Sequence, residues 1–437
     1  MLRKITTSGG QSTSSASSSS SKRSRLSAKL SRSASRSTPG EGPCDEEYVN
    51  PLENVARWRL SANALALRSG ASFAFNWGNR SAPAPSSPSR TIYLDSTLSE
   101  WKGKDAIRVD VYEPSTTTQP SKARAAADPV KRVGVINLHG GGFILGSGTD
   151  DARWACAVVE SLDAVVFSVN YRLAPGYPFP TPVEDTLDSI LQIHARAGEF
   201  NVDPNRLLLS GFSAGGTLSL AAWVILQDPS RWGYVLSSSP SIAGLALFYP
   251  LLDFTTSRPV KRRLCVKPHE TLPKSMTDLF DASYIHPAIS YDNRDDPRLS
   301  PGLMPLEYME RLPPVHLCLC EMDMLLTEGL KFADNLREAG VTVTSRVVLG
   351  EKHAWDKPPP FAPKASVSVE YQAAIVAMRH WLSDDGAKLT RADVGTVNDQ
   401  TRVADDAPLD TRSRVERGER DEGEGEEKRE KILLPGY

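Results

Sequence analysis

Residues 209–216 constrain the fold of this chain more than any other segment. They contain Gly-x-Ser-x-Gly, with Gly211, Ser213 and Gly215 at the fixed positions. Apolar runs precede and follow the motif, which is the context of a buried strand, a sharp turn and a helix. A side chain at either glycine would collide across such a turn. By itself the pattern could be a glycine-rich turn with an incidental serine, but this context favours a nucleophile pushed into a cleft.

The segments around this motif alternate between short apolar runs and helical patterns. The apolar runs lie at residues 133–138, 164–169, 206–210, 244–248, 315–320 and 341–348. Helical periodicity separates several of them, as at residues 183–194 and 327–339. This alternation predicts an α/β fold with a mostly parallel central sheet and helices on both faces. Residues 107–112 alternate apolar and polar side chains, which predicts a half-exposed edge strand.

Composition divides the 437 residues into three parts. Residues 1–46 are rich in serine and basic residues, which predicts a disordered segment. Residues 47–383 form the predicted globular domain, and residues 384–437 mix both charges with few apolar side chains, which predicts a disordered tail. Residues 253–310 interrupt the alternation. Together with the helical stretch in residues 47–88, we expect them to form a helical cap over the site.

Charge and hydropathy narrow the expected partners. The formal net charge of -2 argues against a nucleic-acid partner, and no apolar run is long enough for a transmembrane segment.

Because no secretory signal is visible, we expect reduced thiols and a cytoplasmic location. The basic, serine-rich start is also typical of mitochondrial transit peptides, which is the alternative location. The sequence gives no indication of oligomeric state.

A nucleophilic serine needs a general base and an acid that orients the base. Of the seven histidines, His353 lies on a loop just after the last predicted strand. Catalytic groups gather on such loops in a doubly wound sheet. Asp323 directly follows the strand at residues 315–320, with Glu321 as the alternative acid. The chain order Ser213, Asp323, His353 is the order found in α/β hydrolases.

Backbone N–H groups must also stabilise the developing oxyanion. The three glycines at residues 140–142 close the first parallel strand and let bare backbone approach a ligand. The run matches neither a dinucleotide-binding Gly-x-Gly-x-x-Gly, because Leu145 occupies the last position, nor a phosphate-binding P-loop. We therefore expect an oxyanion hole formed by the N–H groups of Gly141, Gly142 and Ala214.

These motifs occur in the order typical of the hormone-sensitive lipase family of α/β hydrolases, which the chain resembles. They are His-Gly-Gly-Gly-Phe at residues 139–143, Tyr-Arg-Leu-Ala-Pro at 171–175, Gly-Phe-Ser-Ala-Gly-Gly at 211–216, and Asp323 and His353 in their expected loops. The resemblance implies the α/β-hydrolase fold with a helical cap and a carboxylesterase- or arylacetamide deacetylase-like enzyme. Gly176 departs from the acidic residue that is usual there, in a segment that is structural in the family.

The resulting hypothesis is a serine hydrolase that cleaves short- to medium-chain acyl or aryl esters through an acyl-enzyme intermediate. We expect a small-molecule ester substrate and neither a cofactor nor a metal ion. Two alternatives stay open. One is amide hydrolysis by the same residues, as in a deacetylase. The other is a non-catalytic small-molecule-binding member of the fold. Arg172 is expected to tie down its loop through hydrogen bonds, without a part in catalysis.

Overall fold

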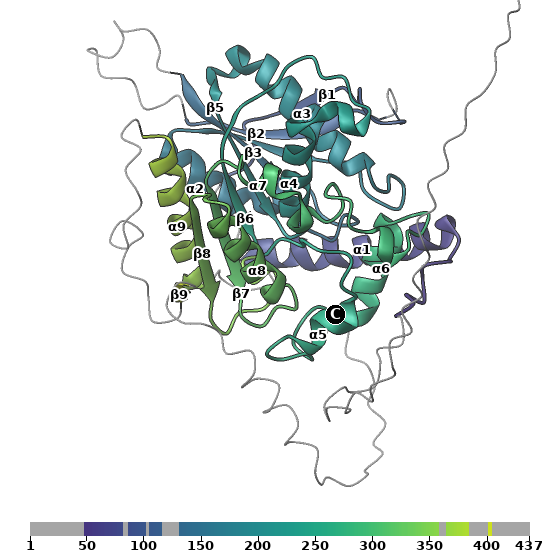
Figure 1. Ribbon diagram of the computed structural model, residues 1–437. Coiled ribbons are helices and arrows are strands. Elements are labelled where there is room, and N and C mark those ends of the chain that lie inside the picture. Colours follow the sequence, from purple (N-terminus) through teal and green to yellow (C-terminus); the bar gives the residue numbers. More distant parts are fainter. Residues whose placement is uncertain are drawn as a thin grey trace, which may run out of the picture. The chain divides into compact units, whose positions relative to one another are not determined.

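The central feature of the fold is one twisted sheet (Figure 1). The computed structural model describes residues 48–81, 86–101, 105–115, 131–357, 364–383 and 401–403. Within these residues, nine strands pair in the order β1-β2-β4-β3-β5-β6-β7-β8-β9. The predicted disordered segment at residues 1–46 lies outside the described residues, as does most of the predicted tail.

Six of these strands run parallel. The strands are β1 (Arg90–Leu94), β2 (Ile107–Tyr112), β3 (Arg132–Leu138), β4 (Val165–Asn170), β5 (Val202–Phe212), β6 (Ile242–Phe248), β7 (Val315–Cys320), β8 (Val343–Val348) and β9 (Thr401–Val403). Strands β4, β3, β5, β6, β7 and β8 pair in parallel. Strands β1, β2 and β9 add antiparallel pairs at the two sides. The prediction of a mostly parallel sheet is therefore confirmed, whereas β9 was not predicted.

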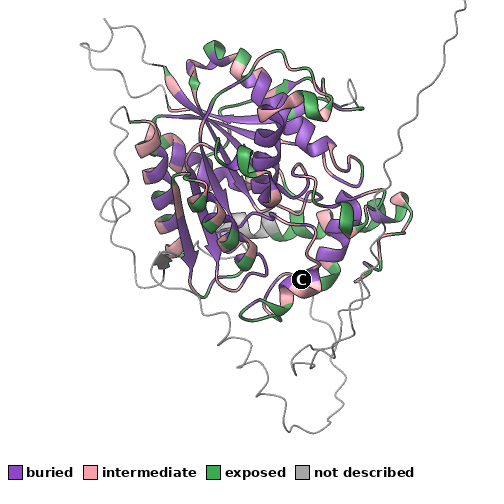
Figure 2. Cartoon of the chain, in the orientation of Figure 1, coloured by how far each residue is buried: buried purple, intermediate pink, exposed green. Residues whose placement is uncertain are grey.

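Helices cover both faces of the sheet. They are α1 (Arg57–Ser81), α2 (Ala152–Leu162), α3 (Thr181–Ala195), α4 (Ala214–Gln227), α5 (Arg258–Arg263), α6 (Lys274–Tyr284), α7 (Leu306–Met309), α8 (Leu326–Glu338) and α9 (Ala365–Trp381). Two apolar clusters lie on opposite faces of the sheet. Leu207 and Leu209 of β5 pack in the cluster that holds α3, α4 and α8. Leu208 and Phe212 pack with α2 and α9, since successive side chains of a strand point to opposite faces. The central strands are accordingly buried (Figure 2).

The predicted position of one strand was wrong. Strand β2 was expected at the edge, but it lies between β1 and β4. Asp110, whose polarity suggested exposure, is fully buried. Its carboxylate accepts hydrogen bonds from Thr91, Arg108 and Asn170. In a sequence, a buried polar residue with such partners looks the same as one that faces water.

The two expected cap segments contact each other. The hydroxyl of Tyr48 donates a hydrogen bond to Asp278 Oδ1 on α6 at 2.6 Å. The guanidinium of Arg294 lies 2.9 Å from the carboxylate of Glu53, just before α1. These contacts join the segment that contains α1 to the insertion that contains α5 and α6. They support the proposal that both segments belong to one cap.

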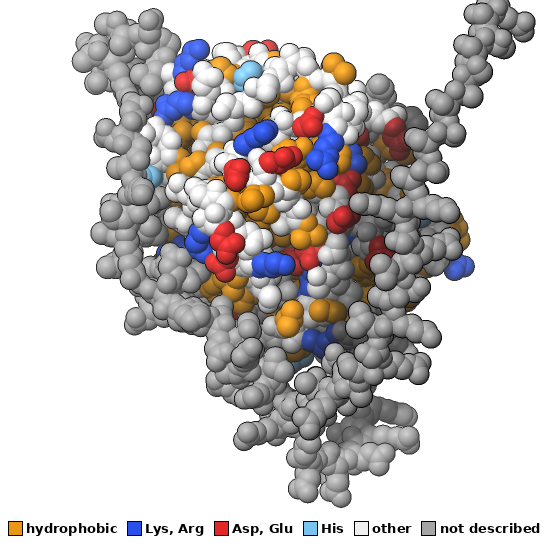
Figure 3. All heavy atoms as spheres, viewed as in Figure 1, with side chains coloured by type: hydrophobic (Ala, Val, Ile, Leu, Met, Phe, Trp, Pro, Cys, Tyr) orange, Lys and Arg blue, Asp and Glu red, His pale blue; other side chains and the backbone are white. Residues whose placement is uncertain are grey.

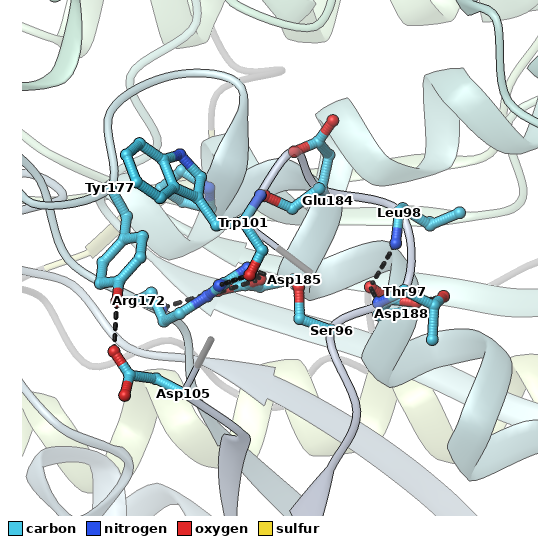
Figure 4. A network of polar contacts seen from close by, with 12 residues as sticks. Ser96, Thr97, Leu98, Trp101, Asp105, Arg172, Tyr177, Glu184, Asp185 and Asp188 are labelled. Atoms are coloured by element: carbon cyan, nitrogen blue, oxygen red, sulfur yellow. Dashed lines mark hydrogen bonds and ion pairs between the residues drawn. The ribbon is translucent and has the colours of Figure 1, made fainter. Parts of the chain in front are cut away.

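The loop after β4 is held by a buried ion pair (Figure 4). Arg172 Nη2 lies 2.5 Å from Asp185 Oδ1 on α3, and both side chains are buried. Arg172 also donates to Ser96 Oγ at 2.7 Å. One turn further along α3, Asp188 accepts the N–H of Thr97 at 2.8 Å. These bonds confirm that Arg172 ties its loop to the helix and to the segment after β1.

The described surface carries charges of both signs. On the face seen in Figure 3, acidic and basic side chains are interspersed and not gathered by sign. None of the helices in the described part of the chain has the length and apolar character that crossing a membrane requires.

Candidate active site

The candidate nucleophile lies in a strained turn between β5 and α4. Ser213 has φ 51° and ψ -117°, a conformation that side-chain-bearing residues rarely adopt. Its N–H donates to the carbonyl of Phe248 at the end of β6 at 2.8 Å. Its own carbonyl accepts the N–H of Gly216 at 2.9 Å. These bonds fix the turn between the sheet and the first turn of α4.

The two glycines of the motif allow the turn to close. A Cβ atom on Gly211 would lie 2.4 Å from the carbonyl oxygen of Gly215. A Cβ atom on Gly215 would lie 2.0 Å from the carbonyl oxygen of Leu138, at the end of β3. Real Cβ atoms do not approach this closely, so the predicted steric requirement at both positions is confirmed.

Parallel strand pairing brings the predicted site residues to one edge of the sheet. Leu138 of β3 is paired with Gly211 of β5, so the glycine loop begins beside the serine turn. Cys320 of β7 is paired with Val348 of β8, so the loops that carry the candidate acid and base begin next to each other. The carboxyl ends of parallel strands are the usual location of such sites.

The three predicted catalytic side chains form a continuous chain of contacts. His353 Nε2 lies 2.8 Å from Ser213 Oγ, and His353 Nδ1 lies 2.5 Å from Asp323 Oδ2. Both His353 and Asp323 are almost fully buried. With the proton on Nδ1, the ring donates to the carboxylate and its Nε2 accepts the serine hydroxyl proton. This is the arrangement in which an imidazole can act as a general base.

The alternative acid lies elsewhere. The carboxylate of Glu321 accepts the N–H of Gly350 at 2.8 Å and thereby supports the loop that carries His353. His139 supports the glycine loop, since its Nδ1 lies 2.7 Å from the carbonyl oxygen of Gly140 and its ring stacks on Tyr171 at 4.3 Å between centroids. Burial lowers the pKa of His139 below its usual value. The contacts of the two candidate acids therefore place Asp323, and not Glu321, against the imidazole of His353.

The glycine loop presents backbone to the same cavity as the serine. Gly141 and Gly142 have φ 110° and 57°, values that favour glycine. Both residues line the cavity together with Ser213. Within the described residues, the N–H groups of Gly141, Gly142 and Ala214 donate no hydrogen bond. Phe280 of α6 packs against Gly142, where an added Cβ would lie 2.2 Å from the phenyl ring.

The cavity has a volume of about 560 Å³ and is lined by residues of the sheet domain and of the two expected cap segments. Ser213, His353 and the glycine loop form its reactive part. The expected cap segments contribute Arg68, Ala71 and Ser72 from α1, and Leu272, Met276 and Phe280 from the insertion. A more polar part is lined by Ser147, Thr149, Asp150 and Lys357.

Two residues of the cavity wall could not be predicted from the sequence as parts of the site. The ring of Tyr249 meets that of His353 edge to face, with centroids 4.7 Å apart, and its hydroxyl donates to Asp356. Lys357 Nζ lies 2.5 Å from Asp151 Oδ1 and 2.9 Å from Asp356 Oδ2. Burial alone would lower the pKa of Lys357, but the two carboxylates raise it. Only the closeness of Asp356 and Lys357 to His353 in the sequence could have pointed to this network.

Residues 135–357 match the family model described as alpha/beta hydrolase fold. Among curated proteins, the chain is 27% identical over 320 residues to bovine arylacetamide deacetylase, covering 62% of this chain and 75% of that protein. It is 34% identical over 225 residues to the carboxylic ester hydrolase LipN of Mycobacterium tuberculosis. That match covers 51% of this chain and 56% of LipN, so the chain spans little more than half of that relative.

Solved structures show the same architecture. EstE1, a thermophilic carboxylesterase cloned from a metagenomic library, superposes with a TM-score of 0.59 at 24% identity, covering 74% of this chain and 99% of that chain. A bacterial heroin esterase superposes with a TM-score of 0.58 at 24% identity, covering 74% of this chain and 93% of that chain. These similarities show the fold and confirm the predicted α/β-hydrolase architecture.

Proposed function

The chain belongs to the hormone-sensitive lipase-like family of α/β hydrolases, and on this premise we propose that it cleaves carboxylic esters through an acyl-enzyme intermediate on Ser213. The observation that carries the proposal is the contact chain from Ser213 through His353 to Asp323 in the wall of a cavity. A cavity of about 560 Å³ is of the size that small-molecule sites have.

The proposed reaction has two stages. His353 Nε2 takes the proton of Ser213 Oγ while that oxygen attacks the acyl carbon, and the resulting imidazolium then protonates the departing alcohol. Water then attacks the acyl-enzyme with His353 again as the base, which releases the acid and restores the serine. Throughout, Asp323 accepts the Nδ1 proton, which holds the ring tautomer and stabilises the imidazolium.

Backbone N–H groups supply the electrostatic part of the proposal. Negative charge develops on the acyl oxygen in both tetrahedral intermediates. The N–H groups of Gly141, Gly142 and Ala214 have no acceptor among the described residues, and Ala214 begins α4, whose N-terminal dipole end is positive. Losing one such donor is expected to remove about 2.7–4 kcal/mol of transition-state stabilisation.

Replacing the nucleophile tests the proposal. Ser213→Ala is expected to abolish turnover of 4-nitrophenyl acetate and 4-nitrophenyl butyrate, because it removes the hydroxyl that lies at hydrogen-bond distance from the base His353. Ser189→Ala is the matched control, since the single hydrogen bond of this buried serine hydroxyl to another described residue goes to the carbonyl of Asp185 within α3. The control is expected to keep its esterase activity. Full activity in Ser213→Ala would refute the assignment.

Amide hydrolysis is a second candidate, favoured by the name of the bovine relative, arylacetamide deacetylase. The same residues could attack an amide, with His353 protonating the departing amine. Comparing kcat/KM for 4-nitrophenyl acetate and 4-nitroacetanilide separates the two activities. Turnover of the ester alone supports the esterase. Turnover of neither by a folded protein supports a non-catalytic binding protein.

A further inference from the structure

One cation in the cavity wall stands apart from the proposed catalytic machinery. Arg68 lies on the cap helix α1 and lines the same cavity as Ser213. Its Nε donates to the carbonyl of Ile144 at 2.6 Å, and its Nη2 donates to the carbonyl of Ala174 at 2.7 Å. Both acceptors are neutral, so these bonds orient the guanidinium without neutralising its charge.

The arginines that are buried within the described part of the chain are partnered differently from the half-buried Arg68. Each of them forms an ion pair with a carboxylate, in the pairs Arg172–Asp185, Arg258–Asp281, Arg294–Glu53 and Arg346–Glu370. Within the described residues, no carboxylate lies at ion-pair distance from Arg68, and its Nη1 donates no hydrogen bond. Burial lowers the pKa of Arg68, but a guanidinium stays charged in proteins.

The other charged side chains of the cavity differ in how they are partnered. Lys357 is held between Asp151 and Asp356. The carboxylate of Asp150 accepts the N–H of Ser147 at 3.1 Å and its hydroxyl at 3.0 Å. Both donors are neutral, so they orient this carboxylate at the polar part of the cavity without neutralising its charge. Arg68 therefore brings to the cavity a positive charge that the described residues do not neutralise. Arg68 is half-buried, and a charge at the wall of a cavity attracts an opposite charge more strongly than the same charge in bulk water does.

We propose that Arg68 binds a carboxylate carried by the substrate, so that the preferred esters bear an anionic group besides the ester itself. This inference rests on the proposed esterase function and names its substrate class. The unused N–H groups on Nη1 and Nη2 form one edge of the guanidinium fork, which suits a carboxylate held by two hydrogen bonds. The carbonyls of Ile144 and Ala174 orient that edge before the substrate arrives.

Two pairs of substrates test the proposal, one for each side of the ester. On the acyl side, mono-4-nitrophenyl glutarate is compared with its terminal amide. On the alcohol side, 4-acetoxybenzoate is compared with 4-acetoxybenzamide. Each kcat/KM is divided by the uncatalysed rate. In at least one pair, this ratio for the natural protein is expected to be about 10-fold to 100-fold higher for the carboxylate substrate than for the amide. This range corresponds to the free energy of a charge-assisted hydrogen bond.

Variants show whether this preference depends on Arg68. Arg68→Gln is expected to remove the preference while turnover of the neutral partner changes by less than about 3-fold, and Arg68→Lys should keep part of it. The matched control is Arg57→Gln. Arg57 also lies on α1 and donates to the carbonyls of Pro175 and Gly176, but it does not line the cavity. This control should keep the full preference.

Other outcomes overturn the inference. Equal rates on both members of both pairs exclude an anion site. If Arg68→Gln lowers kcat/KM equally for charged and neutral esters, then Arg68 only joins the cap to the core and does not bind the substrate carboxylate. If Arg68→Gln does not fold, the preference of the natural protein for the carboxylate substrate is measured at increasing salt concentration. Salt screens charges, so this preference must fall if it arises from the charge of Arg68. A preference that does not change with salt would contradict the proposal. Inactivity of the natural protein on every ester would instead refute the proposed function.

Discussion

At the scale of single residues, the backbone of Ser213 connects the sequence motif to the proposed chemistry. A positive φ at a serine is a strained conformation that persists only where the surrounding structure enforces it. Here the enforcing contacts are the glycines on either side, the carbonyl of Phe248 and the first turn of α4. The strain holds the hydroxyl toward His353, so little reorganisation is needed before attack.

The choice of acid can be tested with two conservative substitutions. Asp323→Asn is expected to lower kcat on 4-nitrophenyl butyrate by about 10³-fold to 10⁴-fold, because an amide facing Nδ1 favours the wrong tautomer. Glu321→Gln is the matched control, since among the described residues the carboxylate of Glu321 accepts only the N–H of Gly350. Loss of this charge should change kcat by less than about 3-fold. The opposite ranking of the two variants would make Glu321 the acid.

The sequence allowed some of these residues to be predicted and not others. Ser213 lies in a local pattern, so its position could be predicted. Asp323 and Glu321 are two residues apart after the same strand, and only their contacts separate them. Tyr249 and Lys357 contact groups on distant elements, and such long-range pairs leave no local pattern. Arg68 was missed for the same reason.

At the scale of elements, the turn between β5 and α4 depends on the absence of side chains at its two glycines. Gly215→Ala would place a Cβ atom 2.0 Å from the carbonyl oxygen of Leu138. We expect a loss of about 1–3 kcal/mol in the free energy of unfolding and a fall of about 10²-fold in kcat, because displacing the turn misplaces Ser213.

A glycine in open space provides the control for this variant. No atom lies within 4 Å of a Cβ added to Gly198, so Gly198→Ala should change neither stability nor kcat appreciably. Urea unfolding and turnover of 4-nitrophenyl butyrate measure both quantities. A Gly215→Ala variant as stable and active as Gly198→Ala would contradict the packing of β3 against the turn.

The positions of the strands along the chain were more predictable than the order in which the strands pair in the sheet. Strands β3 to β8 are apolar runs that parallel sheets bury on both faces, so their positions could be predicted to within a few residues. Strand β2 was misplaced because Asp110 is satisfied by hydrogen bonds inside the sheet. Strand β9 has only three residues and follows a stretch with no apolar pattern.

At the scale of the whole molecule, the site arises because parallel strands end at one edge of the sheet. Loops that lie far apart in the sequence therefore meet there, and α1 and the insertion at residues 253–310 line part of the cavity. No single segment contains the cavity, so its volume and its polar and apolar parts could not be predicted. The cytoplasmic location and the disorder of the two terminal segments stay predictions.

Covalent labelling tests the central claim, that Ser213 is the nucleophile of an ester hydrolase, most directly. The protein is treated with a fluorophosphonate, and the adduct is located by peptide mass spectrometry while esterase activity is followed in parallel. We predict one adduct per chain, on Ser213, formed in proportion to the loss of activity. Activity that survives complete labelling of Ser213, or an inactivating adduct on any other residue, would contradict the claim.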